Sequence, residues 1–192
     1  MESLSQRDIL RFPDQGVGEV WTDITGGPLR GSLTGREQLG EARGEVQVPP
    51  EVRLVELRVA REVQDLSFLA DLHPLSLTYL GLEGPGLDDR TLGHVAQLTG
   101  LRELFLCSST VTRRGLARLR PLHQLQSLSL FDLSLGDEVF EPVSQLGGLE
   151  SLNLRGMTLT GEGLPTLAVL PRLRVLALDA CALDPAGLQG LT

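Results

Sequence analysis

The chain has 192 residues, a formal net charge of −8 and 41% hydrophobic residues, and all 17 of its basic residues are arginine. The lack of lysine excludes enzymes that use a lysine Schiff base, a P-loop lysine or a kinase-type lysine. The acidic balance argues against binding to a nucleic-acid backbone, which requires a basic face. The length is that of one domain of ordinary size.

The chain shows no targeting signal. Residues 1–16 contain no uninterrupted apolar run, so we expect no secretory signal peptide. No stretch reaches the ~20 apolar residues of a membrane span. The two cysteines, Cys107 and Cys181, fit a reducing compartment better than a disulfide framework. These features predict a cytoplasmic protein that does not bind membranes.

Residues 1–53 have a distinct composition, with both isoleucines, the only tryptophan and four of the 11 prolines. Residues 19–25 and 45–48 have the composition of strands, and a glycine-rich loop at 26–35 lies between them. We expect an N-terminal cap that contains a β-hairpin, with partial disorder in residues 1–17. Trp21 is expected to plug the end of the core, and the alternative is that it contacts a ligand.

From Leu77 onward the chain repeats every 24 residues. Counting the first leucine of each segment as position 1, positions 1, 4, 6, 11, 16, 19 and 22 hold Leu, Val or Phe at all 34 sites that the five segments contain. The segments begin at Leu77, Leu101, Leu125, Leu149 and Leu173. This regularity predicts a stack of similar structural units.

The spacing within a segment predicts its conformation. Apolar residues at positions 4 and 6, with variable residues beside them, alternate as in a strand with one buried face. The step of three between positions 16, 19 and 22 suits one face of a short helical segment. Position 12 precedes this segment and carries a helix-capping side chain at Asp88, Thr112 and Thr160.

Acidic residues follow the predicted caps within one turn. Examples are Asp89 and Glu138, which lie where the helix dipole favours negative charge. The acidic pairs 88–89 and 137–138 leave a divalent-ion site as an alternative, but the dipole alone accounts for them. We therefore expect no bound metal.

The unit LxxLxLxxxxL followed by xGLxxLxxL resembles the repeat of leucine-rich repeat proteins, and the match covers residues 77–192. The turn sequences VTRRGL, LTGEGL and LDPAGL resemble the VTDxGL form common in bacterial repeats. The resemblance implies an α/β solenoid, with a curved parallel sheet on the concave face and short helices on the convex face.

One departure from the family concerns position 9, where leucine-rich repeats often have a ladder of asparagine side chains. This chain has other residues there: Pro85, Ser109, Leu133, Met157 and Cys181. We therefore expect the turns after the strands to rely on water and backbone pairing.

Residues 54–59 (LVELRV) match the start of a further, atypical repeat. Atypical terminal repeats are expected because a terminal unit has only one neighbour. The chain therefore divides into an N-terminal cap, 1–53, and a repeat domain, 54–192. The domain has about six repeats: 54–76, 77–100, 101–124, 125–148, 149–172 and 173–192.

The candidate functional residues follow from the direction of side chains in the predicted strands. Positions 3 and 5 must point out from the concave face, and position 7 lies at the end of the strand. Three of the chain's seven aromatic residues fall at these positions in adjacent repeats. Exposed aromatic side chains are common anchors of protein interfaces. We predict a partner-binding face made of Tyr79, Glu103, Phe105, Phe131, Asn153 and Arg155.

The alternative for the aromatic side chains is that they pack on their neighbours or beneath the N-terminal segment. A second charged feature is the arginine-rich sequence VTRRGLARLR at 111–120. We expect it to form a solvated helix face, and the alternative is an acidic partner bound there.

Catalytic residues are not recognisable. The three histidines, His73, His94 and His123, fall at unrelated places, without a nucleophile elbow or metal-ligand spacing. The glycine-rich loop at 26–35 lacks the lysine of a phosphate-binding loop. We expect no enzyme activity and no cofactor.

The resemblance implies a non-catalytic protein-protein interaction module that binds a partner protein through the concave face. The alternative is a structural or regulatory subunit of a larger assembly, such as a bacterial enzyme or defence complex. It would dock, or self-associate end to end, through the C-terminal repeat, where Leu183, Leu188 and Leu191 would face solvent on an open edge. An arginine-only composition rich in Gly, Leu and Pro is typical of a GC-rich bacterial genome.

Overall fold

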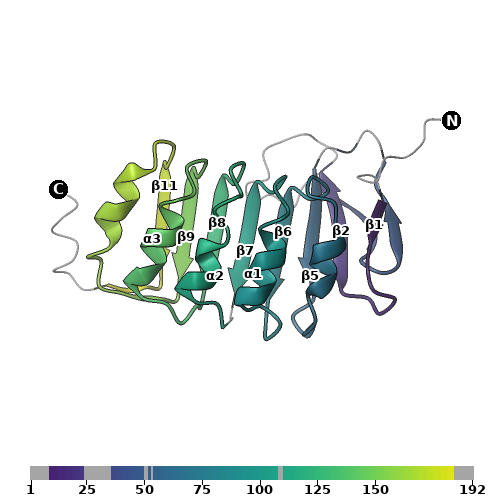
Figure 1. Ribbon diagram of the computed structural model, residues 1–192, viewed down its shortest axis with the longest axis horizontal. Helices are drawn as coiled ribbons and strands as arrows, with labels where there is room; N and C mark the ends of the chain where they lie inside the picture. The colour runs from purple at the N-terminus through teal and green to yellow at the C-terminus, as the bar shows by residue number, and fades with distance from the viewer. Residues whose placement is uncertain (1–8, 24–35, 50–51, 53, 108–109, 184–192) are drawn as a thin grey trace.

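The computed structural model describes residues 9–23, 36–49, 52, 54–107 and 110–183. These residues form an α/β solenoid of the leucine-rich repeat type, in which the strands lie side by side in one long sheet. Short helices follow one another along one face of this sheet (Figure 1). We call the opposite face, which no helix of the described residues covers, the open face.

Parallel strands, one from each repeat, form most of the sheet. They are β5 (Val55–Val59), β6 (Tyr79–Glu83), β7 (Glu103–Cys107), β8 (Ser127–Phe131), β9 (Ser151–Arg155) and β11 (Val175–Asp179). From β6 to β9 the strands pair in register, so that Leu80, Leu104, Leu128 and Leu152 lie in one line across the sheet. These leucines are at most 2% exposed and pack in the core between the sheet and the helices.

The N-terminal segment extends the sheet with antiparallel strands. Strand β2 (Gly18–Asp23) lies between β5 and β3 (Arg36–Glu41), while β1 (Ile9–Arg11) pairs with β4 (Glu45–Gln47). The antiparallel cap is therefore confirmed, but its pairing differs from the expected one. The strand predicted at 45–48 pairs with β1, and β3, which the sequence analysis did not identify, is the partner of β2.

The described end of the segment 1–17 belongs to the core. Leu10, Phe12 and Val17 are at most 7% exposed, and Leu10 lies in β1. Residues 9–17 therefore adopt a packed conformation where the sequence suggested partial disorder within 1–17. Residues 1–8 lie outside the described part of the chain.

The helices are short and lie between consecutive strands. They are η2 (Ser67–Asp71), α1 (Asp89–Val95), α2 (Arg113–Ala117), η3 (Asp137–Val139), which continues into α3 (Phe140–Val143), and η4 (Leu164–Val169). Three of them are 3₁₀ helices with three residues per turn, which suits the three-residue step of the apolar positions. The predicted caps form at α1 and α2, where Asp88 accepts the Thr91 N–H at 2.8 Å and Thr112 accepts the Arg114 N–H at 3.2 Å.

Apolar side chains fill the position at which related repeats carry asparagine. Leu133 and Met157 are 3% and 2% exposed, and Cys181 Sγ donates a hydrogen bond to the Leu154 carbonyl at 3.4 Å. Ser109 lies outside the described residues. Buried apolar side chains thus occupy this position at the Leu133 and Met157 turns, and backbone pairing joins neighbouring turns, as where Ala182 N–H donates to the Met157 carbonyl at 3.0 Å. Beyond Met157, the two-residue strands β10 (Thr158–Leu159) and β12 (Ala182–Leu183) pair in parallel.

The residue directly after the strand has a left-handed backbone in four repeats. The φ angles are 92° at Gly84, 51° at Asp132, 67° at Gly156 and 50° at Ala180. The N–H of this residue still pairs with the neighbouring repeat, as where Asp132 N–H donates to the Arg155 carbonyl at 2.8 Å, and the left-handed φ turns the chain away after it. The hydrogen-bond ladder of the sheet is thereby extended one residue beyond the strands.

Two aspartates join neighbouring repeats beside the helix N-termini. Asp89 accepts the N–H and the hydroxyl of Thr112 at 2.8 and 2.7 Å. Asp137 accepts the same two groups of Thr160 at 2.7 and 2.8 Å, and also the Gly163 N–H at 2.8 Å. We call these contacts the Asp–Thr staples. The carboxylates of Asp89 and Asp137 thus accept hydrogen bonds from the next repeat, whereas the sequence alone suggested that the helix dipole accounts for the acidic residues of these turns.

The staples alternate along the array. One joins the repeats that begin at Leu77 and Leu101, and the other joins those that begin at Leu125 and Leu149. Between them, where Arg113 and Gly136 occupy the staple positions, an exposed ion pair links Arg113 Nε to Glu141 Oε2 at 3.1 Å. The two Asp–Thr staples are therefore separated by one junction that has an ion pair in their place.

Strand β11 is the edge of the sheet among the described residues. Val175 and Leu176 are 41% and 38% exposed, although Leu176 pairs in register with the buried Leu152. The Leu183 side chain, Leu188 and Leu191 lie outside the described residues, so their predicted exposure stays a prediction. Within the described ranges, no helix is both long and apolar enough to cross a membrane.

Candidate functional site

The open face is produced by the alternation of side chains along each strand. In β6, β7, β8 and β9 the second and fourth residues are buried, and the first, third and fifth are at least partly exposed. Because neighbouring side chains point to opposite faces, these outer residues lie on the open face. All six predicted site residues occupy such positions: Tyr79, Glu103, Phe105, Phe131, Asn153 and Arg155.

Three of the predicted residues form a cluster, which we call the Phe–Phe–Arg cluster. The rings of Phe105 and Phe131 meet edge to face, with their centroids 5.0 Å apart and an interplanar angle of 78°. The Arg155 guanidinium lies 5.6 Å from the centroid of the Phe131 ring. Both geometries are favourable for aromatic rings, which carry negative charge on the face and positive charge at the edge.

The aromatic side chains of the cluster are both packed on a neighbour and partly exposed. Its two phenylalanines pack on each other, yet both are only half-buried and neither is covered by a helix. Arg155 is exposed. The contacts hold the rings in place on the surface, which leaves a rigid apolar patch with a cation at its border.

Tyr79 lies beside this cluster, at one wall of a shallow pocket. The Arg58 guanidinium lies 5.7 Å from the centroid of the Tyr79 ring. The ring bends over Gly81, where an added Cβ would lie 3.2 Å from the Tyr79 ring and hydroxyl. The pocket has a volume of about 280 Å³ and is lined by Arg58, Val59, Tyr79, Gly81, Leu82, Glu83 and Phe105.

Strand β5 contributes two charged residues that the prediction of the site omitted. Glu56 is fully buried on the open-face side, and Arg58 Nη2 lies 3.5 Å from Glu56 Oε2. A buried carboxylate needs such a partner, because desolvation of an unpaired charge is costly. Positions 3 and 5 of the repeat at 54–76 are Glu56 and Arg58, so the rule that selected Tyr79 could have identified both.

Trp21 belongs to the open face and does not plug the core. In β2 it pairs with Glu56, and Glu56 pairs with Tyr79, so the three residues form one row across the sheet. The neighbouring Val20 is fully buried and pairs with Leu57 in the core, whereas Trp21 is half-buried with its Nε1 donating to Glu19 Oε2 at 3.0 Å. The predicted position of Trp21 is therefore wrong, because β2 places Val20, rather than Trp21, toward the core.

Glu103 and Asn153 lie on the same face, in β7 and β9. Glu103 is half-buried and pairs in register with Tyr79 and Ser127. Asn153 lies between Ser129 and Ala177, and its buried Oδ1 has no hydrogen-bond partner among the described residues. The structure thus brings Phe105, Phe131 and Arg155 together and leaves these two residues as separate polar positions.

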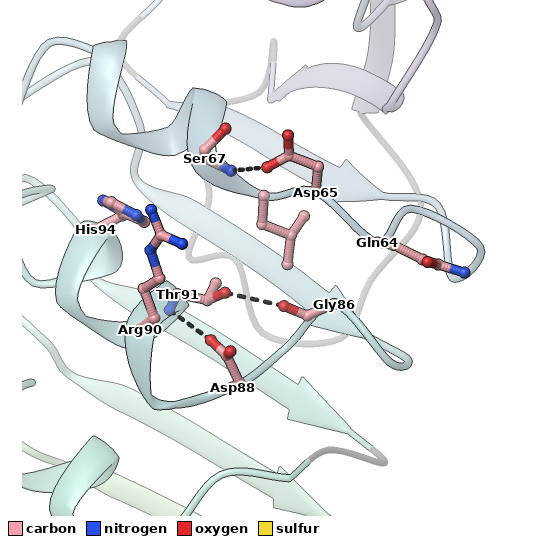
Figure 2. A pocket seen from close by; sticks show the side chains of 9 residues that line it. Gln64, Asp65, Ser67, Gly86, Asp88, Arg90, Thr91 and His94 are labelled. Carbon is pink, nitrogen blue, oxygen red and sulfur yellow. Dashed lines mark hydrogen bonds between the residues drawn. The ribbon is translucent and has the colours of Figure 1, made fainter.

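A larger pocket, of about 400 Å³, lies between η2 and α1 (Figure 2). Its carboxylates already serve as local caps, since Asp65 accepts the Ser67 N–H at 2.9 Å and Asp88 accepts the Thr91 N–H at 2.8 Å. The Thr91 hydroxyl donates to the Gly86 carbonyl at 2.9 Å. These bonds engage both carboxylates and the threonine hydroxyl of the pocket.

Electrostatics explain why both aspartates of this pocket stay ionised. The hydrogen bond from the Thr91 N–H lowers the pKa of Asp88, and the hydrogen bond from the Ser67 side chain lowers the pKa of the exposed Asp65. Arg90 and His94 add favourable charge near Asp65. The pocket therefore places Arg90 beside two carboxylates that already accept hydrogen bonds from neighbouring residues.

Other candidate sites receive no support from the described residues. Within them, no group of three or more His, Cys, Asp or Glu residues could hold a metal ion. Arg114, Arg118 and Arg120 are exposed on the helical side, and their neighbour Arg113 pairs with Glu141. The arginine-rich sequence thus lies on a solvated helix face, as predicted.

Comparison with known proteins gives little further information. No model of a known protein family matches the chain, and no curated protein matches it significantly. Among solved structures, the chain is similar to internalin C2 from Listeria monocytogenes at 19% sequence identity and a TM-score of 0.40. The match covers 71% of this chain and 76% of internalin C2. A similarity this low carries no argument about fold or function, so the leucine-rich repeat architecture rests on the chain's own sheet and repeats.

Proposed function

We propose that the chain is a non-catalytic module that binds a partner protein on the open face of its sheet. The observation that carries this proposal is the Phe–Phe–Arg cluster, a rigid and partly exposed aromatic patch on a face without helices. Preorganised aromatic and arginine side chains lose little conformational freedom on binding, and such residues dominate the energy of protein interfaces.

The chemistry of the face defines the kind of segment that would bind. The edge of Phe105 and the face of Phe131 suit an apolar side chain of the partner, and Arg155 suits a carboxylate beside it. Trp21, Arg58 and Tyr79 would extend the contact toward β2, across the open-face positions of β2, β5 and β6. The partner is therefore expected to present an apolar anchor next to an acidic group.

The test is affinity capture from the source organism with the wild-type chain and a Phe105→Ala/Phe131→Ala double variant. We expect the wild type to retain a specific protein that the double variant loses, because the anchor surface has been removed. A matched control is the Arg114→Ala/Arg118→Ala variant, which removes two exposed side chains from the helical face. Circular dichroism and thermal melting check that all variants are folded.

Two results would contradict the proposed binding on the open face. If the Phe105→Ala/Phe131→Ala variant is folded and retains the same protein as the wild type, the open face is not the binding surface. If the control loses the protein together with the double variant, the helical face is involved and the site is wrongly assigned.

A second candidate function is that of a subunit docked through its C-terminal edge. The exposure of Val175 and Leu176 in strand β11 favours it, because apolar side chains at a sheet edge gain from coverage. Residues 184–192 follow this edge and lie outside the described part of the chain. A mass that rises with concentration, and a Leu176→Glu variant that stays monomeric, would support this alternative.

A further inference from the structure

A cleft at the edge of the sheet where the strands begin differs from the other pockets in its charge. It has a volume of about 260 Å³ and is lined by Arg102, His123, Gln124, Gln126, Gly148 and Arg172. We call it the cationic cleft. Two of its six lining residues are arginine, one is histidine, and none is acidic.

Gly148 explains why a cleft forms at this point. A Cβ on Gly148 would lie 2.5 Å from the His123 carbonyl oxygen, so the backbone packs closely on the preceding repeat. No side chain stands above this contact, while the same position of the neighbouring repeats carries Gln124 and Arg172. The glycine thus forms the floor of a depression whose walls are long polar side chains.

The side chains of the two arginines of the cleft have no partner among the described residues. Arg102 and Arg172 are exposed, and among the described residues neither forms an ion pair or a side-chain hydrogen bond. By contrast, Arg11, Arg58 and Arg113 each pair with a glutamate. The guanidinium groups of the cleft therefore keep their full capacity to donate hydrogen bonds to a ligand.

The positive charge extends along this edge in a chain that is acidic as a whole. Arg120 and Arg174 lie in the same turns as the cleft residues, and Glu150 and Glu103, the first residue of β7, are acidic residues at this edge. Neither glutamate lines the cleft. Because the chain has a net charge of −8, its surface as a whole repels anions. The local excess of positive charge at this edge attracts them.

The pocket between η2 and α1 also contains basic residues, but unlike the cationic cleft it has acidic residues beside them. There, Arg90 and His94 share the lining with Asp65 and Asp88, whose pKa values are lowered so that both stay negative (Figure 2). An anion would be repelled by these carboxylates. The cationic cleft has no such internal neutralisation, although it is the smaller of the two.

We propose that the cationic cleft binds a phosphate group. Two guanidinium groups offer paired N–H donors that match phosphate oxygens, the imidazole of His123 adds a donor, and the amides of Gln124 and Gln126 provide further donors. The inference does not depend on the open face, because the cleft lies at the edge of the sheet and shares no residue with the aromatic contacts. It gives the protein a second binding site, which takes a phosphate group.

The test is isothermal titration calorimetry of the full chain at low ionic strength with two probes. One probe is inorganic phosphate, and the other is a short phosphoserine peptide, with the unphosphorylated peptide as its control. The variants are Arg102→Gln/Arg172→Gln in the cleft and Arg114→Gln/Arg118→Gln on the helical face, which remove the same charge. We expect saturable binding by the wild type and the control, weakened about tenfold or more in the cleft variant.

The two probes distinguish the sources of the phosphate. Binding of both supports the cleft as a site for phosphate in any form, and binding of the phosphopeptide alone supports a phosphorylated protein segment as the ligand. The proposal is overturned if neither probe binds the wild type, or if both arginine pairs weaken binding equally. Phe105→Ala/Phe131→Ala should leave phosphate binding unchanged, so failure of the open-face proposal and failure of this one are separable.

Discussion

At the scale of single residues, Asp137 shows how much structure one carboxylate organises. It accepts the N–H groups of Thr160, Gly161 and Gly163 and the hydroxyl of Thr160. Burial of the carboxyl raises its pKa, but the hydrogen bonds from Gly163 and Thr160 outweigh burial and hold the pKa below the ordinary value of 3.8. The folded protein thus favours the ionised form more than the unfolded chain does.

The lowered pKa of Asp137 predicts a dependence of stability on pH. The stabilisation is fully present above the unfolded-state pKa and is lost as the pH falls through the lower folded-state pKa. We expect Asp137→Ala to reduce the free energy of unfolding at about pH 7, and this difference from the wild type to shrink in the acid range below the ordinary value of 3.8. Urea denaturation at a series of pH values measures it.

The control for Asp137 is Glu138→Ala, which removes the exposed acidic residue next in the chain. It should change stability little at any pH, because no hydrogen bond to its side chain is present among the described residues. A pH dependence shared by both variants would mean that general charge, rather than the Asp–Thr staple, stabilises the array.

At the scale of elements, the junction between α1 and α2 depends on one glycine. Gly115 lies inside α2 and is buried, and a Cβ on it would overlap the Asp89 carboxylate that binds Thr112. In an ordinary helix interior, alanine is more favourable than glycine by ~1 kcal/mol. At Gly115 the overlap with Asp89 would destabilise an alanine, and the helix preference would stabilise it. The sign of the change in the free energy of unfolding for Gly115→Ala therefore shows which effect is larger.

We expect Gly115→Ala to destabilise the protein by about 1–3 kcal/mol, because the new methyl group displaces the Asp89 carboxylate from Thr112. In an Asp89→Ala background the same change should cost less, since the overlap with the carboxylate is gone and only the close approach to the Cα of residue 89, at 3.1 Å, remains. Thermal and urea unfolding of the four proteins of this double-mutant cycle measure the coupling.

Gly147→Ala is the matched control for this cycle, because no atom lies within 4 Å of the added Cβ. It should be close to neutral in both backgrounds. If Gly115→Ala stabilises the wild-type protein, the staple is weaker than the intrinsic preference of the helix for alanine.

The elements differ in how far the sequence could predict them. The strands of the repeats were predictable, because leucines such as Leu104 and Leu106 alternate with outer residues at a fixed spacing. The pairing of β2 with β3 and β5 was not, because an antiparallel register depends on contacts between distant segments that no periodicity reports. The error over Trp21 follows from this, since the register decides which face of β2 is buried.

The Asp–Thr staples were present in the sequence but needed the structure to be recognised. The residue pairs Asp89–Thr112 and Asp137–Thr160 have the same spacing of 23 residues, and a glycine follows each threonine three residues later. A short-range explanation, the helix dipole, accounted for the aspartates equally well. Only the stacked structure shows that each carboxylate is hydrogen-bonded to the threonine of the next repeat.

At the scale of the whole molecule, the array has a stability gradient toward its C-terminal edge. Strand β8 has a neighbouring strand on each side and fully buried leucines, Leu128 and Leu130. Strand β11 is paired on one side within the described sheet, and its Leu176 is 38% exposed. In a repeat array each unit is stabilised mainly by its neighbours, so the two strands should open with different free energies.

Amide hydrogen exchange measured by mass spectrometry tests this gradient. We expect peptides that contain 175–179 to exchange at least about tenfold faster than peptides that contain 127–131, because local opening at the edge disrupts fewer contacts. A variant with weakened core packing, Leu176→Ala, should increase exchange at β11 and leave β8 unchanged. Uniform protection across both strands would show that the array opens only as one cooperative unit.

The candidate site was predictable to a similar, partial extent. Alternation identified Phe105, Phe131 and Arg155 as neighbours on one face, and the structure brings them into contact. It did not identify Trp21, because that residue comes from a segment without a repeat. The cationic cleft could not be found from the sequence, because Arg102 and Arg172 are 70 residues apart and line one cleft only when the repeats are stacked.

The alternation of the staples restricts how the array can change its length. Deletion of residues 101–124 would place Asp89 beside Gly136 and Val139, which offer neither a hydroxyl group nor room for the carboxylate. Deletion of 101–148 would instead place Asp89 beside Thr160 and Gly163, the partners that Asp137 now has. An internal deletion in this solenoid therefore preserves an Asp–Thr junction when it removes two repeats together, and disrupts it when it removes residues 101–124 alone.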